Sequence, residues 1–394
     1  MSPPLPASPP EPASSSLATP ACPHRPPCPG CPRFGAPSIP PDAREWLRTF
    51  AREHALPPPV IHDAPARGHR HRARLAIRGR AANPRIGLFQ AGSHRIVATP
   101  DCAVHHPALN AAAAALREAI RETGVVPYVD ASHLGTLRYV QLVVERRSGG
   151  VQVVLVGRGE SPECLGALPE ALAARLGDGL QGLFFNAQPE RTNAILGAET
   201  VLLAGRPAVR ERLGGVDVFF PPTAFGQNHL PLFERALGRI QQLVPEHARV
   251  AELYCGVGAI GLGLLARGAT LAFNERAPGG LEGLALGLAA RPASERARAT
   301  RFDGAAGERA EIVADAEVVV VDPPRRGLDA RLLDALVATP PARLVYLACD
   351  RTSLARDLER LLAAGRLAPR GVEAFDFFPF TEHVETLVWL DRTA

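Results

Sequence analysis

Lysine is absent from this chain: all 44 basic residues are arginine, a bias that a GC-rich genome produces and from which we draw no functional conclusion. Long apolar runs are absent as well, and no stretch approaches the roughly 20 apolar residues of a transmembrane helix. The first residues offer neither a basic n-region nor an apolar h-segment, so we expect no secretory signal. We therefore expect a cytoplasmic protein without a membrane partner. In that compartment, seven cysteines indicate metal ligands or catalysts rather than disulfides.

The length of 394 residues and the hydrophobic content of 46% predict a globular protein of two or three domains. The first residues are Pro, Ser and Ala with few large apolar side chains, which predicts a disordered tail. We expect the tail over 1–21, a cysteine-containing and basic β-rich part over 22–110, an α+β part over 111–222, and an α/β domain over 223–394.

Three cysteines lie within ten residues of one another. They are Cys22, Cys28 and Cys31, separated by prolines and Gly30, and a fourth, Cys102, follows farther along the chain. Four cysteines with one remote in sequence suit either an iron–sulfur cluster or a structural zinc ion, and the spacing does not choose between them. Unrelated free thiols are the alternative.

A basic stretch follows the first three cysteines. Residues 64–100 contain eight arginines and no acidic residue. Arginine recurs at alternate positions, with Ala73, Leu75 and Ile77 between, which predicts a strand with one charged and one buried face. Such a row indicates a footprint for a nucleic-acid backbone rather than a solvated face. The candidate RNA-binding residues are Arg70, Arg72, Arg74 and Arg78.

From residue 231 onward, apolar strands and helices alternate, which predicts a doubly wound parallel sheet. The turn Gly256-x-Gly258-x-x-Gly261 lies between a strand and a helix, and Glu275 follows at the end of the next strand. This pattern is typical of a nucleotide-type ligand and is shared by NAD and S-adenosylmethionine (SAM) enzymes. The segment Asp322-Pro323-Pro324 favours a methyltransferase, because it predicts a rigid turn on which a substrate base can lie flat.

A cysteine ends another buried strand. Cys349 follows the apolar run 344–348 and precedes a helix, where helix N-terminal amides favour a thiolate. A small core residue is the alternative. Near the C-terminus, Glu385 begins the last strand, which alone is a weak signal.

Several of these motifs together resemble a known family. The segments DPPRRG, ACDRTSLARDL and FPFTEHVETLVWL, preceded by PPTAFGQNHL and ELYCGVGAIGL, closely resemble the RNA uracil-5-methyltransferases. The resemblance covers nearly everything from Cys22 onward. No OB-like TRAM domain fits ahead of Cys22, so the chain is most similar to the short 23S rRNA branch.

The resemblance implies a Rossmann-like class I SAM-methyltransferase domain, an N-terminal iron–sulfur segment and a central RNA-binding domain. It implies that Cys349 is the nucleophile, Glu385 the base that removes the C5 proton, and the four cysteines ligands of a [4Fe–4S] cluster rather than of zinc. The candidate SAM-binding residues are Gln227, Tyr254, Gly256, Gly258, Glu275, Asp303 and Asp322.

The expected function is thus SAM-dependent methylation of a uridine in 23S rRNA, with no protein partner predicted. A tRNA substrate is the first alternative. A non-catalytic iron–sulfur RNA-binding or assembly factor is a second alternative. The absence of a binding signal in an isothermal titration with SAM would favour it. An NAD dehydrogenase is disfavoured by the Pro-Pro turn and the basic strand.

Overall fold

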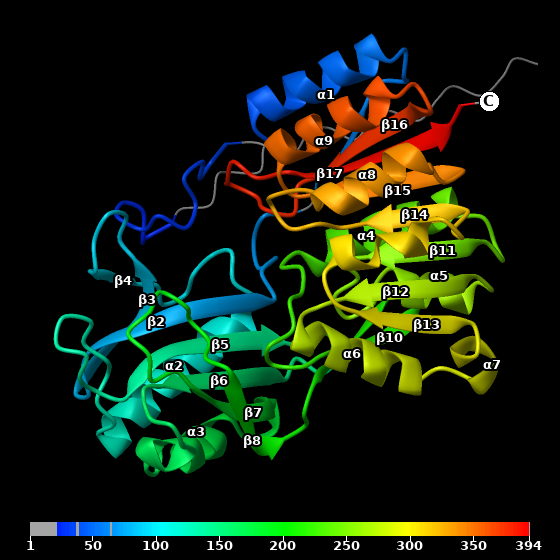
Figure 1. Ribbon diagram of the computed structural model, residues 1–394. Helices are drawn as coiled ribbons and strands as arrows, with labels where there is room; N and C mark the ends of the chain where they lie inside the picture. Colours follow the sequence, from blue (N-terminus) through cyan, green and yellow to red (C-terminus); the bar gives the residue numbers. More distant parts are fainter. Residues whose placement is uncertain (1–21, 37–38, 64, 394) are drawn as a thin grey trace, which may run out of the picture.

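The computed structural model describes residues 22–36, 39–63 and 65–393, and the expected tail over 1–21 lies outside them (Figure 1). Two β-sheets dominate these residues. An eight-stranded sheet carries most of the C-terminal half, and a seven-stranded sheet carries most of the N-terminal half, with a two-stranded hairpin as a third sheet. Among the described residues no helix is both long and apolar enough to cross a membrane.

The eight-stranded sheet has the order β1-β16-β17-β15-β14-β11-β12-β13. Neighbours pair in parallel except β17, which runs antiparallel to both β15 and β16. The strands are β1 (Val60–His62), β11 (Arg249–Leu253), β12 (Thr270–Glu275), β13 (Ala299–Asp303), β14 (Val318–Val321), β15 (Arg343–Ala348), β16 (Leu367–Phe375) and β17 (Glu385–Arg392). The expected doubly wound α/β fold is confirmed.

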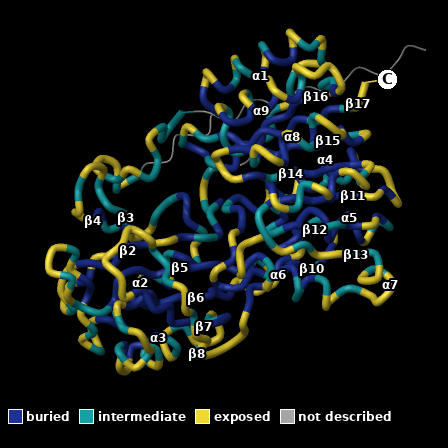
Figure 2. Tube along the Cα trace, viewed as in Figure 1, coloured by how far each residue is buried: buried dark blue, intermediate teal, exposed yellow. Residues whose placement is uncertain are grey.

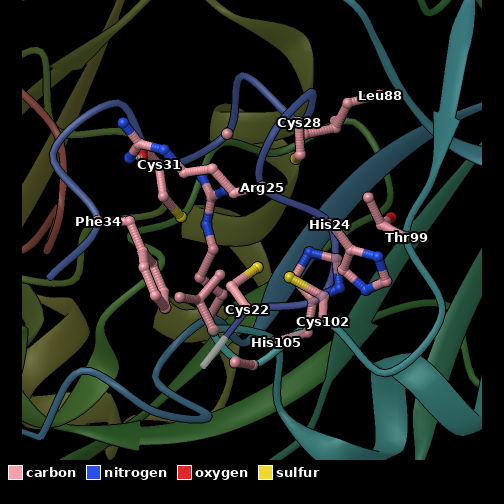
Figure 3. A pocket seen from close by; sticks show the side chains of 14 residues that line it. Cys22, His24, Arg25, Cys28, Cys31, Phe34, Leu88, Thr99, Cys102 and His105 are labelled. Carbon is pink, nitrogen blue, oxygen red and sulfur yellow. Dashed lines mark hydrogen bonds between the residues drawn. The ribbon is translucent and has the colours of Figure 1, made fainter. Parts of the chain in front are cut away.

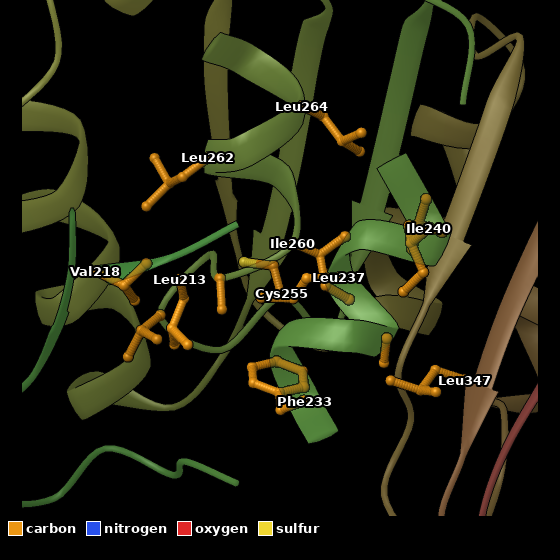
Figure 4. Packing of buried hydrophobic residues seen from close by; sticks show 14 of the residues in the cluster. Leu213, Val218, Phe233, Leu237, Ile240, Cys255, Ile260, Leu262, Leu264 and Leu347 are labelled. Atoms are coloured by element: carbon orange, nitrogen blue, oxygen red, sulfur yellow. The ribbon is translucent and has the colours of Figure 1, made fainter. Parts of the chain in front are cut away.

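Helices cover both faces of this sheet. Successive residues of its strands point to opposite sides, and because the strands are apolar at both sets of positions, both faces must be covered. Val318 and Val320 of β14 belong to one core and Val319 and Val321 to the other. The first core packs under α4, α5 and α6 and the hairpin (Figure 4); the second packs under α1, α8, α9 and η3. The helices are α1 (Pro41–Glu53), α4 (Leu230–Leu243), α5 (Gly261–Ala266), α6 (Pro278–Ala289), α7 (Ala293–Arg296), η3 (Ala306–Val313), α8 (Ala330–Ala338) and α9 (Arg351–Ala363).

An N-terminal segment belongs to this sheet and not to the basic part of the chain. Helix α1 places Leu47 and Phe50 in the same core as Leu344 and Leu354. Strand β1 pairs in parallel with the edge strand β16. The expected division of the chain therefore differs from the structure here, since residues 39–62 lie with the C-terminal sheet.

The seven-stranded sheet has the order β4-β3-β2-β5-β6-β7-β8. Its elements are β2 (Arg72–Arg80), β3 (Asn83–Phe89), β4 (Ile96–Ala98), α2 (Pro107–Thr123), β5 (Leu137–Val144), β6 (Val151–Gly157), η1 (Pro162–Leu165), α3 (Leu168–Leu176), η2 (Gly177–Gly179), β7 (Leu180–Ala187) and β8 (Glu199–Gly205). Helices α2 and α3 cover one face, and the central strands are buried while the edge strand β8 is largely exposed (Figure 2). The boundary expected at residue 110 falls inside this unit.

The hairpin of β9 (Val209–Leu213) and β10 (Val216–Phe220) leads from one sheet to the other. Its apolar side chains pack in the C-terminal core. Hydrogen bonds fasten the seven-stranded sheet to the hairpin segment: Gln141 Nε2 donates to the Pro222 carbonyl at 2.6 Å, and Arg146 Nε pairs with Glu211 at 2.8 Å.

Candidate active site

Cys349 lies at the carboxyl end of β15, directly before α9, and is half-buried. Its neighbour Asp350 caps the helix: the side-chain Oδ1 accepts a hydrogen bond from the Ser353 amide at 2.9 Å. An N-cap of this kind holds the start of the helix in one place. The local sequence therefore fixes the position of the thiol at the edge of the parallel strands, where α/β folds place their ligands.

Glu385 is the first residue of β17 and is fully buried. Both of its carboxyl oxygens have no hydrogen-bond partner among the described residues. In the β15–β17 pair, Ala348 is opposite Thr386, so Cys349 and Glu385 are the next residues on the two strands. The fold thus brings together the two residues that the sequence analysis predicts as nucleophile and base.

Asp322 follows β14, the neighbour of β15, and completes a cluster of acidic and thiol groups. Burial raises its pKa to about 7. Burial, and after it the charge of Asp322, raises the pKa of Glu385 well above its ordinary value. A buried carboxyl without a partner avoids ionisation.

The same surroundings raise the pKa of Cys349 to about 12, with burial as the largest cause, followed by Glu385 and Asp322, while Arg325 acts in the opposite direction. The expectation that helix amides favour a thiolate here is therefore wrong for this state of the site, because burial and two nearby carboxyls outweigh the N-terminus of α9. The thiol is protonated at neutral pH.

The turn after Asp322 is fastened to the helix that follows Cys349. Asp357 of α9 is fully buried, and its Oδ2 accepts hydrogen bonds from the Leu328 amide and the Tyr346 hydroxyl, each at 2.8 Å. Gly327 has φ +82°, and a Cβ there would lie 2.4 Å from the Asp357 carboxylate. Glycine therefore permits this close approach.

The glycine turn is held by two acids. Glu275 at the end of β12 accepts a hydrogen bond from the Gly256 amide at 2.8 Å. Buried Glu252 in β11 accepts one from the Gly261 amide at 2.9 Å, and a Cβ at Gly261 would lie 2.2 Å from that carboxylate. The turn is thereby fixed at the carboxyl ends of β11 and β12.

The other candidate SAM-binding residues occupy different positions. Gly258 lies in the glycine turn at φ +78°, and Tyr254 precedes it and accepts a hydrogen bond from the Asp329 amide at 2.9 Å. Asp303 is paired in register with Glu275 on the next strand. Gln227 lines a pocket between the sheets, beside Arg72, and its buried Oε1 has no hydrogen-bond partner among the described residues.

Four cysteines line one pocket at the edge of the seven-stranded sheet (Figure 3). Cys22, Cys28 and Cys31 come from the N-terminal turn and Cys102 from the segment after β4. Burial and the neighbouring thiols raise the pKa of Cys31 to about 11, and Arg70 opposes this. No three His, Cys, Asp or Glu side chains in the described part of the chain form a group that could hold a metal ion.

The four candidate RNA-binding arginines do not form one exposed row. Arg78 is buried, pairs with Asp130 at 2.6 Å and lies over three aromatic rings. Arg72 donates to the Ala224 carbonyl at 2.5 Å, and Arg70 lines the cysteine pocket. Of the four, Arg74 alone is exposed. The predicted row is wrong at Arg78, because alternation does not reveal aromatic and acidic partners from β3, β5 and the loop before β5.

Two buried acids were missed by the sequence analysis, Glu252 and Asp357. Burial, and then the charges of Asp322 and Glu275, raises the pKa of Glu252 well above its ordinary value. A signal was present for both: Glu252 interrupts an apolar strand, and Asp357 lies on the apolar face of α9 next to Leu354 and Leu358.

Comparisons with known proteins agree with this geometry. A family model described as tRNA (uracil-5-)-methyltransferase matches residues 310–393. An uncharacterized RNA methyltransferase of Protochlamydia amoebophila is 32% identical over 359 residues, which cover 90% of this chain and 93% of the relative. Another from Parasynechococcus marenigrum is 34% identical, with 85% of this chain and 73% of the relative covered.

The crystal structure of the Pyrococcus abyssi tRNA (uracil-54, C5)-methyltransferase with S-adenosyl-L-homocysteine has a similar fold. The TM-score is 0.72 at 24% identity, with 88% of this chain and 82% of that chain covered. The likeness shows that this chain shares the fold of that methyltransferase. The chain belongs to the RNA uracil-5-methyltransferase family.

Proposed function

We propose that this enzyme methylates C5 of a uridine in 23S rRNA to give 5-methyluridine, with Cys349 as the nucleophile and Glu385 as the base. One observation carries the proposal: a half-buried thiol and a fully buried carboxyl without a hydrogen-bond partner lie on adjacent strand ends, beside the Asp322 turn. An unpartnered buried carboxyl is costly to keep in a protein, so a catalytic role is the natural explanation.

The chemistry follows from what C5 of uracil requires. That carbon is a poor nucleophile until a thiolate adds to C6 and makes the ring an enolate. The enolate carbon then takes the methyl group from the SAM sulfonium, and S-adenosylhomocysteine leaves. Glu385 takes the proton from C5, the C5–C6 double bond forms again, and the bond between C6 and the Cys349 sulfur breaks.

The raised pKa values suit these two roles differently. Once it is ionised, a carboxylate with a raised pKa is a stronger base, which favours proton removal by Glu385. The Cys349 thiol, by contrast, must lose its proton before it attacks. A sulfonium placed beside Asp322 offsets the negative charges that oppose the thiolate, and Arg325 acts in the same direction.

SAM is proposed to lie along the carboxyl ends of β11, β12 and β14. The Gly256–Gly258 turn approaches it closely, Glu275 faces its ribose, and Asp322 lies near its methyl group. Tyr254, Asp303 and Gln227 are proposed as further contacts. Gln227 is supported by its unpartnered buried oxygen.

The cysteine pocket is proposed to hold a [4Fe–4S] cluster. The donor set fits: four thiols line one pocket, and thiolates are the ligands of such clusters. A single zinc ion needs sulfurs within about 4 Å of one another, whereas a cluster of four irons places them farther apart. The cluster is proposed as structural, and no chemical step passes through it.

The target base must leave its stack to reach Cys349, at a cost of a few kcal/mol that contacts elsewhere offset. The seven-stranded unit is proposed to supply them. Its exposed arginines on β2, Arg74 and Arg80, replace the original row of four as the candidates for phosphate contacts.

A tRNA substrate is the second candidate, favoured by the name of the matching family model and of the Pyrococcus abyssi enzyme. The cysteine set favours 23S rRNA, since it resembles the cluster site of the bacterial ribosomal members. Transfer of tritiated methyl groups from SAM to unmodified 23S rRNA and tRNA transcripts distinguishes the two. We expect 5-methyluridine in the 23S transcript; label in tRNA alone would replace the rRNA assignment.

A further inference from the structure

The cysteine turn (residues 22–36) contacts the loop that leads into the base. This base loop (residues 376–384) joins β16 to β17 and ends at Glu385. The Arg33 amide donates a hydrogen bond to the Phe380 carbonyl at 2.9 Å, and the Arg33 guanidinium donates to the Thr381 carbonyl at 3.3 Å. The same guanidinium lies 3.9 Å from Glu382 and opposes the burial that raises the pKa of Asp376. Arg33 therefore contacts the base loop at Phe380, Thr381 and Glu382.

Phe34 extends this contact from the base loop to the cysteines. Its ring lines the cysteine pocket (Figure 3). It lies 5.0 Å from the ring of Phe380, centre to centre. Phe380 is buried and has φ +65°, a left-handed conformation that costs energy for a residue other than glycine. Such a conformation persists where its surroundings impose it, and here an amide and an aromatic ring of the cysteine turn do so.

The direction of the Glu385 side chain depends on the backbone that delivers it. Its carboxyl oxygens have no hydrogen-bond partner among the described residues, so no side chain there steers them. The base loop carries internal bonds at its tip, from the Thr381 hydroxyl to the Phe378 carbonyl at 2.8 Å and from the His383 amide to that hydroxyl at 3.2 Å. Because the tip has its own internal hydrogen bonds, it moves as a unit, and the cysteine turn is the segment that it packs against.

We propose that Arg33 and Phe34 are positioning residues for Glu385, and that the occupied cysteine site keeps the base in reach of the C5 proton. The inference rests on the proposed function. It gives the cysteine site a specific task in the reaction: Cys31 lies two residues before Arg33, and its carbonyl accepts a hydrogen bond from the Phe34 amide at 3.1 Å. A turn fixed at its cysteines holds Arg33 and Phe34 against the base loop.

The reaction divides into steps that report on this role. Attack by Cys349 and methyl transfer need no base at C5, whereas release of the product needs Glu385. A displaced base therefore leaves the enzyme joined to methylated RNA through the bond between sulfur and C6. We expect Phe34→Ala and Phe380→Ala to accumulate this adduct on an unmodified 23S rRNA transcript with SAM, seen as a labelled band on a denaturing gel. Turnover should fall on the order of tenfold to hundredfold.

A matched control lies in the same pocket. Leu88 of β3 lines the cysteine pocket beside Gly30, on the side away from Phe34 (Figure 3), and Leu88→Ala should not accumulate the adduct. Phe380→Ala removes the ring contact from the base-loop side, so its iron content should match that of the wild type. Cys28→Ser should lose iron and accumulate the adduct as Phe34→Ala does.

Trapping with 5-fluorouridine RNA separates the possible outcomes, because fluorine at C5 blocks the final step and the adduct then requires no base. The proposal is supported if Phe34→Ala and Phe380→Ala form the adduct with 5-fluorouridine RNA as the wild type does and also accumulate the adduct on RNA that contains ordinary uridine. Wild-type turnover in Phe34→Ala and Phe380→Ala overturns it. Loss of trapping together with turnover also overturns it, since the turn then acts on folding or RNA binding. If Cys349→Ala retains methylation, the proposed function itself fails, whatever these variants do.

Discussion

Cys349 and Glu385 stand one residue beyond the Ala348–Thr386 pair, at the carboxyl end of β15 and the start of β17. The antiparallel insertion of β17 into an otherwise parallel sheet creates this relationship, because it brings the start of one strand to the end of another. The two residues are 36 positions apart in sequence. Their proximity gives the proposed nucleophile and the proposed base access to the same pyrimidine ring.

Glu385→Gln should separate methyl transfer from product release. Glutamine has the shape of the buried carboxyl but cannot accept the C5 proton, so turnover should fall by about 10²- to 10⁴-fold while the covalent adduct accumulates. Multiple-turnover kinetics and denaturing gels measure the two effects. A variant that turns over normally would show that another group removes the proton.

SAM affinity should rise with pH and level off above about 7. Burial raises the pKa of Asp322 to about 7, so its carboxyl is largely protonated below that pH. The sulfonium favours the ionised form and lowers this pKa on binding, so binding below pH 7 must release a proton, at a cost of up to about tenfold in affinity per pH unit. Calorimetric titration over a pH range that brackets 7 measures the dependence.

Two controls accompany that titration. S-adenosylhomocysteine carries no sulfonium charge and should show a weaker dependence on pH. Asp322→Asn should bind SAM more weakly and remove the dependence. An affinity for SAM that falls as pH rises would contradict the placement of Asp322 beside the sulfonium.

Arg78 and Arg74 provide a matched pair on one strand. Arg78→Ala should lower the free energy of unfolding by about 2–3 kcal/mol, because it leaves a buried space and removes the partner of Asp130. Arg74→Ala should change it by about 1 kcal/mol, because the exposed Arg74 side chain donates a single hydrogen bond, to Gln141 Oε1 at 2.7 Å. Urea denaturation compares the two, and equal losses would contradict the assignment of Arg78 to the core.

The cysteine site predicts a brown protein after anaerobic purification, with about four irons and four acid-labile sulfides per chain. Cys28→Ser should lose both and still bind SAM, because the glycine turn belongs to the other sheet. Metal and sulfide analysis with SAM titration measures this. A colourless preparation with one zinc ion per chain would reject the cluster.

Strand and helix patterns predicted much of the fold. Apolar runs such as Val318–Val321 alternate with amphipathic helices, and the parallel order follows from that alternation. The placement of α1 and β1 against β16 was not predictable, since pairing between residues about 310 positions apart leaves no local pattern. The domain boundary expected at residue 110 does not match the structure for a related reason, because β2 pairs with β5 across that position.

The site was predictable where a residue terminates a strand. Cys349, Asp322 and Glu275 all end β-runs, and ends of parallel strands meet at one edge. The protonation state of Cys349 was not predictable, because burial and the neighbouring carboxyls arise from the tertiary fold. The same holds for Arg78, whose aromatic and acidic partners come from other segments.

Mass spectrometry of the enzyme trapped on 5-fluorouridine RNA in the presence of SAM tests the central claim most directly. Two cysteines lie just beyond strand ends in this sheet, half-buried Cys349 after β15 and buried Cys255 after β11, and the modified peptide distinguishes them. The account predicts a methylated fluoropyrimidine on the peptide that contains Cys349, and none after Cys349→Ala. An adduct on another residue, or methylated RNA from the Cys349→Ala enzyme, would contradict it.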